Sequence, residues 1–370
     1  MLRLSRHPVV GIALSVVFFI VLDAAIFRSG FYARFVSPES TAGKFFYSVY
    51  YERGRQADPK RDVLLLGNSK MEWGFGAKHW EDFAPESPIH FIQGATSASD
   101  EEWWYYMLRT LDPNHDRYAA IVIPITAYRI APWSTDFQNR DDTAEVLAPI
   151  LRLADWPGFV GEFSRPELRS RATVLALSGA RRYALDLQDF LLHPLKRLEE
   201  LRRRAEIGQN WLRDFTGATG TMDELRVDPA TGRVAAYPAR FPEFKRRETD
   251  TEFIRPPASD APRLTARNAA FEAEWIARIV KAYDGSKTRL IFIQVPRFPV
   301  PTPSHTPIDN APDVRDMIPR APNVTVLSPD EFTFLEQPRY FTDILHLNSD
   351  GLKLFTEKLG TEVERVMAGN

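Results

Sequence analysis

The chain contains no cysteine, and this absence excludes several kinds of chemistry at once. Disulfide bonds, thiolate zinc sites and a cysteine nucleophile all require that side chain. The 7 histidines are scattered and form no metal-ligand motif such as HExxH, so we predict neither a metal nor another cofactor. The formal net charge is only -2 over 370 residues, so no overall positive field exists that would attract nucleic acid.

Long hydrophobic runs are also scarce, but one stands near the N-terminus. Residues 8–27 read PVVGIALSVVFFIVLDAAIF and would form a helix of roughly 30 Å, the thickness of a bilayer core. Asp23 is the single charge, and it lies towards the end of the run, where a charge in a membrane costs less. We predict a transmembrane signal anchor over residues 1–30. The alternative is a cleaved signal peptide, because small residues follow Asp23.

Both alternatives export the rest of the chain. Arg3 and Arg6 precede the run and favour a cytoplasmic N-terminus, whereas Arg28, Arg34 and Lys44 follow it and argue weakly against that orientation. The charge rule is weakest for long translocated domains. We therefore expect a single-pass protein of the inner (cytoplasmic) membrane whose body is periplasmic or extracellular.

After a juxtamembrane connector (residues 31–60), short apolar runs that predict strands alternate with segments that predict helices. The predicted strands are 62–67, 89–94, 119–125, 289–295 and 323–327, and the predicted helices are 101–111, 265–283 and 348–367. This alternation predicts a three-layer α/β/α domain over residues 61–370 with a parallel sheet.

An insertion at about residues 131–261 interrupts the alternation, and it is too long for an ordinary loop. Helices are predicted at 146–153 and 182–204, and a hairpin with Pro and Gly in its turn at 225–234. We expect this insertion after the third strand to form a cap or a surface for a partner.

Two polar segments are the candidates for chemistry. Gly67-Asn68-Ser69 follows the first strand, at the carboxyl edge where open α/β sheets bind ligands. Ser69 is either an exposed hydroxyl at a helix start or an ordinary N-cap. Asp343 and His346 lie three residues apart before the last helix, so the carboxylate can orient the imidazole. A serine nucleophile needs such a base.

The order of these segments resembles the SGNH (GDSL-like) hydrolase superfamily: strand, GNS turn and helix, a Gly after the second strand, and a terminal DxxH followed by Leu-Asn-x-x-Gly. The resemblance implies that Ser69 is the nucleophile and that Asp343 and His346 complete a catalytic triad. It also implies that the backbone N–H groups of Ser69 and Gly94 form the oxyanion hole.

The sequence departs from that pattern at two places. Asn68 stands where the superfamily usually has Asp, and the Asn expected after the third strand has no clear match. Thr126, Tyr128 or Arg129 could supply the missing donor, or could simply pack at the strand end. Arg297 follows the fourth strand and could bind an anionic substrate group or only pair with a surface carboxylate. We therefore assign Asn68 and these residues as candidates for substrate binding.

The layout as a whole is similar to membrane-anchored SGNH-type acyltransferases of polysaccharide export, such as alginate-acetylation and teichoic-acid-alanylation proteins. This similarity implies acyl (typically acetyl) transfer to, or removal from, an exported polysaccharide, beside a multi-pass membrane-bound O-acyltransferase as partner. Two alternatives stay open. One is a non-catalytic subunit with the same fold that binds glycan or assists assembly, and the other is a structural anchor that acts through the insertion.

Overall fold

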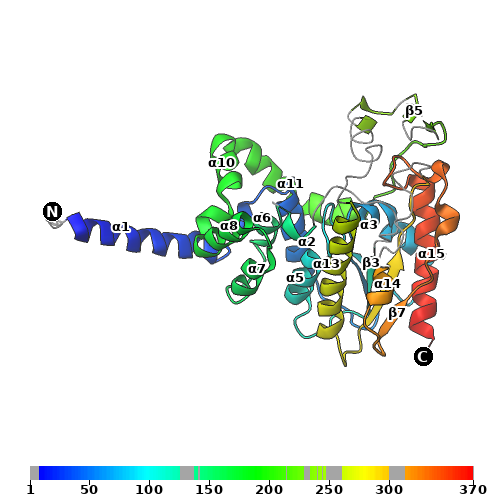
Figure 1. Cartoon of the computed structure of the whole chain (residues 1–370), viewed down its shortest axis with the longest axis horizontal. Helices are drawn as coiled ribbons and strands as arrows, with labels where there is room; N and C mark the ends of the chain where they lie inside the picture. Colours follow the sequence, from blue (N-terminus) through cyan, green and yellow to red (C-terminus); the bar gives the residue numbers. More distant parts are fainter. Residues whose placement is uncertain are drawn as a thin grey trace. The chain divides into compact units, whose positions relative to one another are not determined.

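Figure 1 shows the computed structural model of the chain. The structure describes residues 8–125, 137–140, 142–213, 215–228, 234–239, 241–243, 245–246, 261–299 and 313–369. The chain divides into two compact units. We call them the helical unit (Met1–Ser48 and Asp141–Gly208) and the sheet unit (Val49–Arg140 and Gln209–Asn370).

The helices follow in chain order. Before the sheet the chain forms α1 (Pro8–Asp23), the π-helical turn η1 (Ala24–Arg28), η2 (Tyr32–Phe35) and α2 (Thr41–Gly54). The second part of the helical unit contains α6 (Thr143–Leu147), α7 (Trp156–Glu162), α8 (Pro166–Leu177), α9 (Gly179–Arg182), α10 (Ala184–Leu192) and the start of α11 (Pro194–Arg213). The sheet unit contains α3 (Ser69–Gly74), α4 (Ala77–Phe83), α5 (Glu101–Leu111), η3 (Phe137–Asn139), α13 (Ala261–Ala282), α14 (Val314–Met317), η5 (Thr333–Leu335), η6 (Pro338–Tyr340) and α15 (Ser349–Ala368).

A parallel five-stranded sheet forms the centre of the sheet unit, which confirms the predicted mixed α/β fold and all five predicted strands. Its order is β2-β1-β3-β6-β7, and neighbouring strands pair in parallel throughout. The strands are β1 (Asp62–Leu65), β2 (His90–Gln93), β3 (Ala120–Ile125), β6 (Arg289–Gln294) and β7 (Val324–Val326). The predicted hairpin is present as the antiparallel pair β4 (Arg226–Val227) and β5 (Val234–Ala236).

Alternation of side chains along the strands builds the core. Val63 and Leu65 of β1 are fully buried in one cluster with Val122 of β3. Phe75, which follows α3, and Phe355 of α15 belong to the same cluster. Because successive strand residues point to opposite faces, Leu64 points away from this cluster. The last helix therefore packs against the end of α3, where the N–H of Gly76 donates to the hydroxyl of Thr356, 280 residues further along the chain.

The apolar run forms the one helix in the described residues that is long and apolar enough to cross a membrane. This helical span is Val10–Arg28, with a mean hydropathy of 2.6. Most of its side chains are exposed, and α1 extends away from the other helices of its unit (Figure 1). Asp23 is the exception and is 4% exposed. Its carboxylate accepts the N–H groups of Gly179 (2.9 Å) and Ala180 (2.7 Å) and pairs with Arg28 at 2.8 Å. These partners offset the cost of the buried charge.

The predicted insertion does not form one body. Residues 142–208 belong to the helical unit with the N-terminal segment, while the hairpin belongs to the sheet unit. Two predicted helices also differ. The segment at 146–153 ends its helix at Leu147: Ala148 still has helical angles, but Pro149 has no N–H with which to continue the backbone hydrogen bonds. The segment at 182–204 breaks into α10 and α11 at Pro194, which cannot continue a helix but can begin one.

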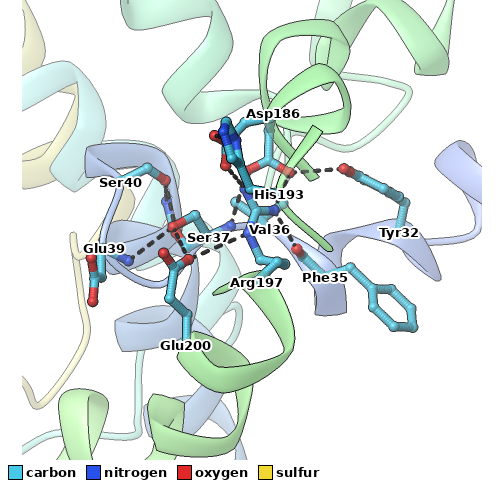
Figure 2. A network of polar contacts seen from close by, with 12 residues as sticks. Tyr32, Phe35, Val36, Ser37, Glu39, Ser40, Asp186, His193, Arg197 and Glu200 are labelled. Atoms are coloured by element: carbon cyan, nitrogen blue, oxygen red, sulfur yellow. Dashed lines mark hydrogen bonds and ion pairs between the residues drawn. The ribbon is translucent and has the colours of Figure 1, made fainter. Parts of the chain in front are cut away.

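Arg197 is the centre of the helical unit, although the basic run around it reads as a solvated helix face. The side chain is 1% exposed, and its guanidinium donates to Asp186 (2.9 Å), to Asp189 (2.7 Å) and to the backbone oxygen of Phe35 (2.8 Å). Asp186 also accepts the hydroxyl of Tyr32 (2.8 Å), so the connector is fastened to α10 and α11 (Figure 2).

We predict that Arg197→Leu lowers the free energy of unfolding of the helical unit by about 3 kcal/mol, because it leaves the buried carboxylate of Glu200 and the partly buried one of Asp186 without their cation. Arg202→Leu is the matched control on the same helix, since Arg202 is 81% exposed and its ion pair with Glu199 is long at 3.8 Å. Urea unfolding of the full chain in detergent measures both variants. Equal losses in the two would contradict a structural role for Arg197.

Candidate active site

The strand order places the turn after β1 at the point where open sheets bind ligands. Numbered along the chain, the five strands follow the order 2-1-3-4-5, so the direction of winding reverses between β1 and β3. Ligand crevices form at this switch point, at the carboxyl ends of the strands. Ser69 stands four residues after the end of β1 and begins α3. The predicted nucleophile is therefore at the predicted edge of the sheet.

Gly67 and Asn68 shape this turn. Gly67 has a φ of +147°, which disfavours other residues, and a Cβ there would lie 2.5 Å from the Cβ of Met71. Asn68 is the N-cap of α3, because its side chain accepts the N–H of Lys70 at 3.1 Å. Ser69 is thus not the cap. Neither its hydroxyl nor its N–H has a hydrogen-bond partner among the described residues.

Asp343 and His346 form a tight hydrogen-bonded pair. The ring Nδ1 of His346 lies 2.9 Å and 3.0 Å from the two carboxylate oxygens of Asp343. Asp343 Oδ1 also accepts the N–H groups of Leu345 (2.9 Å) and His346 (2.8 Å). Because a carboxylate only accepts, these contacts assign the proton to Nδ1 and leave a lone pair on Nε2. This is the tautomer that a general base requires.

The turn that carries the pair is held by the start of the last helix. Asn348, two residues after His346, accepts the N–H groups of Asp350 (3.2 Å) and Gly351 (3.0 Å) and caps α15. Its amide donates to the backbone oxygens of Gly220 (2.8 Å) and Arg339 (2.6 Å). The imidazole is therefore positioned by a rigid helix start.

Trp73 links His346 to the helix of Ser69. The rings of Trp73 and His346 lie 4.9 Å apart at an angle of 33°. Ser69 and Trp73 are four residues apart in α3, so they lie on the same face of this helix. His346 thus lies on the side of α3 that carries Ser69. Its Nε2 is buried and has no hydrogen-bond partner in the described part of the chain, so the bond to Ser69 is not formed in this state. Such bonds are often long before substrate binds.

Lys245 is a third partner of Asp343. Its ammonium lies 2.5 Å from Asp343 Oδ2 and 5.9 Å from the centre of the Trp73 ring. Burial alone would raise the pKa of Asp343, but the hydrogen bonds from His346 and Lys245 outweigh it and lower the pKa well below its usual range. Nothing in the sequence around Lys245 distinguishes it from a solvated surface lysine, so only the fold reveals its position. Trp73 was detectable by its spacing from Ser69.

Lys70 and Arg297 add positive charge beside the turn. Loss of water around the half-buried ammonium, together with the charge of Arg297, lowers the pKa of Lys70 to about 8. Arg297 itself pairs with Glu336, with Nε at 3.0 Å from Oε1. Pairing with a carboxylate was one of the two roles predicted for Arg297, and its role in substrate binding stays a prediction.

The oxyanion hole is less complete than the triad. The N–H of Gly94 donates to the backbone oxygen of Leu65 at 2.9 Å, as part of the pairing of β2 with β1. A Cβ at position 94 would lie 3.0 Å from that same oxygen, so close packing already accounts for this glycine. Gly94 as an oxyanion donor stays a prediction, and the role would require it to share or release this bond. Thr126, Tyr128 and Arg129 lie outside the described residues.

Metal ligands do not converge in the described part of the chain: no three His, Cys, Asp or Glu side chains there are placed to hold an ion. What this site offers is a hydroxyl, a base with a free lone pair and an orienting carboxylate.

Comparison with models of known protein families finds no match, and comparison with curated proteins finds none either. The resemblance to SGNH hydrolases therefore stays a prediction that rests on the motif residues.

The lowered pKa of Asp343 predicts a specific acid dependence. Its carboxylate contributes stability above the pKa of the unfolded chain, near 4, and this contribution is lost as the pH falls further. Asp343→Asn should cost about 2–3 kcal/mol of unfolding free energy at pH 7, and the difference from wild type should shrink below pH ~4. Urea unfolding at several pH values tests this. Asp82→Asn, at an exposed ion pair with Lys78, is the control and should show little difference at any pH.

The low pKa of Lys70 can be measured directly. NMR of the protein with ¹³C-methylated lysines should show one signal, absent in Lys70→Arg, that titrates with a midpoint of about 8. Arg297→Gln should move the Lys70 midpoint upward, because it removes a neighbouring positive charge. A Lys70 midpoint at the ordinary value for lysine, about 10.4, would contradict this description of the site.

Proposed function

We propose that the chain is an SGNH-like serine O-acyltransferase or esterase with a three-layer α/β/α catalytic domain. The observation that carries the proposal is the Asp343–His346 pair, whose buried Nε2 has no partner among the described residues and lies on the Ser69 side of α3. An unpartnered buried nitrogen costs free energy, so its presence calls for an explanation. Acceptance of a proton from a serine is one such explanation.

The proposed reaction has two half-reactions. His346 Nε2 takes the hydroxyl proton of Ser69 while the oxygen attacks an ester carbonyl, and the Ser69 N–H donates to the developing oxyanion. The tetrahedral intermediate expels the donor alcohol, which receives the proton from His346, and an acyl-serine remains. A sugar hydroxyl or water then loses its proton to His346 and attacks the acyl group. The second tetrahedral intermediate breaks its bond to Ser69 Oγ, which takes the proton back from His346 as the new ester or acid leaves. Asp343 stabilises the imidazolium in both steps.

A polysaccharide is the substrate that the surroundings favour. Trp73 and Phe215 pack 5.6 Å apart beside His346, and such aromatic faces suit sugar rings. A pocket of about 430 Å³ is bounded by the segment that carries His346, and its lining is Thr219, Gly220, Thr221, Asp223, Arg339, Tyr340, Asn348, Ser349 and Asp350. The triad residues do not line it, so it would hold a more distant part of a long substrate. Lys245 is paired with Asp343 and Arg297 with Glu336, so these cations do not by themselves select an acidic polymer.

The proposed location is the outer side of the cytoplasmic membrane, in the periplasm or outside the cell, with α1 as signal anchor. A multi-pass membrane-bound O-acyltransferase would supply the acyl groups, as the resemblance implies. The same triad would serve transfer and hydrolysis, so dependence of the reaction on this partner would distinguish the two.

The mechanism predicts that Ser69→Ala and His346→Ala each lower the turnover of an activated acetyl ester by roughly 10⁴-fold. The measurement uses the full chain in detergent. His79→Ala is the control, because His79 pairs with Glu357 away from the triad and should keep wild-type turnover. Unchanged turnover in the Ser69 and His346 variants would exclude the mechanism.

A non-catalytic glycan-binding subunit is the second candidate. The bond between Gly94 N–H and Leu65 favours it, because an oxyanion with only one donor loses about 2.7–4 kcal/mol of stabilisation. Under this alternative, Ser69→Ala retains full affinity for an acetylated acidic polysaccharide, and the wild-type chain neither releases nor transfers acetate.

A further inference from the structure

Six leucines of the helical unit are exposed, although leucine is a residue that proteins usually bury. Their exposed fractions are Leu177 72%, Leu185 74%, Leu191 71%, Leu192 65%, Leu195 81% and Leu198 46%. All six lie within 22 consecutive residues, in α8, α10 and α11. Exposed apolar clusters of this kind mark surfaces that are covered in the working protein.

The span fixes where this surface begins. The guanidinium of Arg28, the last residue of the apolar helical span, donates to the backbone oxygen of Leu177. Asp23, one and a half turns earlier, accepts the N–H groups of Gly179 and Ala180. The junction of α8 and α9 is therefore held at the end of α1, within a few residues of the level at which α1 would leave a bilayer.

The start of α10 also packs beside the end of the span. Phe27 packs against Tyr183 at the start of α10, with ring centres 6.1 Å apart. Leu187 and Phe190 lie on the same side of α10 as Tyr183 and pack against the same apolar cluster. Leu185 and Leu192 are seven residues apart on one face and stay exposed.

The helix α11 continues this arrangement. Buried Arg197 ties it to Asp186 (Figure 2) and to Asp189 of α10, while Leu195 and Leu198 are exposed. The short helices thus expose these six leucines and contact one another through polar and aromatic side chains.

We propose that this leucine surface lies in the lipid interface, with its side chains among the upper acyl chains beside the end of α1. The inference rests on the proposed membrane anchor. Interfacial helices pair an apolar face with basic residues that contact headgroups, and Arg181 and Lys196 are exposed next to Leu185 and Leu195. The helical unit is then a platform that sits on the membrane, so the span cannot rotate freely against it.

Lipid rather than a protein partner is the favoured occupant, because the surface is continuous with the span. A protein partner on this surface would have to displace the lipid that surrounds the end of α1 near Arg28 and Asp23.

The absence of cysteine makes a direct test possible. Single cysteines at Leu191 and Leu195 carry an environment-sensitive fluorophore in the full chain, reconstituted into vesicles that contain acyl-chain spin-labelled lipids. Val16→Cys, in the middle of the span, reports whether α1 is inserted. Glu167→Cys is the matched aqueous control, since Glu167 is 74% exposed and lies ten residues, or about 15 Å, from Leu177 along α8.

The expected result is strong quenching at Val16, clear quenching at Leu191 and Leu195 with shallow spin labels, and none at Glu167, because interfacial helices sink their apolar face by about 5–10 Å. If Val16 is quenched but Leu191 and Leu195 behave like Glu167, the surface faces water or protein and the inference is wrong while the anchor stands. If Val16 is not quenched, the anchor fails and the inference fails with it.

Discussion

The hydrogen bond between His346 Nδ1 and Asp343 is the interaction on which the proposed chemistry depends. It assigns the proton to Nδ1 and leaves the lone pair of Nε2 buried and without a partner in the described residues. That arrangement has a free-energy cost, which a purely structural histidine would avoid by finding a donor. Lys245 places its ammonium beside the same carboxylate, so Asp343 stays ionised through both half-reactions of the proposed cycle.

A second buried carboxylate, Asp23, organises the other unit. In the sequence Asp23 is a single charge in an apolar run. In the fold its carboxylate accepts two backbone N–H groups and pairs with Arg28. These bonds make the end of α1 part of the helical unit rather than a separate tether. Arg197 is the centre of a second group of polar contacts, which holds α10 and α11 to the connector.

The sheet was predictable from sequence because its five strands are short apolar runs with clear flanks, and all five are present. The candidate triad was predictable because Asp343 and His346 are close in sequence and Ser69 follows a strand. Lys245 and Trp73 were missed. The position of Lys245 comes only from packing between distant segments, whereas the spacing of Trp73 from Ser69 was visible in the sequence. The division of the insertion was also missed: residues 142–208 pack with the N-terminal helices through Asp23 and Arg197, which no local pattern indicates. The bounds of the helices near Pro149 and Pro194 were predicted wrongly, although both prolines are evident in the sequence.

Reactivity of Ser69 is the most direct test of the central claim, that His346 activates this hydroxyl. The full chain is treated with a fluorophosphonate, and the modified residue is located by peptide mass spectrometry. The account predicts that Ser69 is labelled in the wild type and that this labelling is lost in His346→Ala but kept in His79→Ala. An unlabelled Ser69, or equal labelling of Ser69 with and without His346, would contradict it.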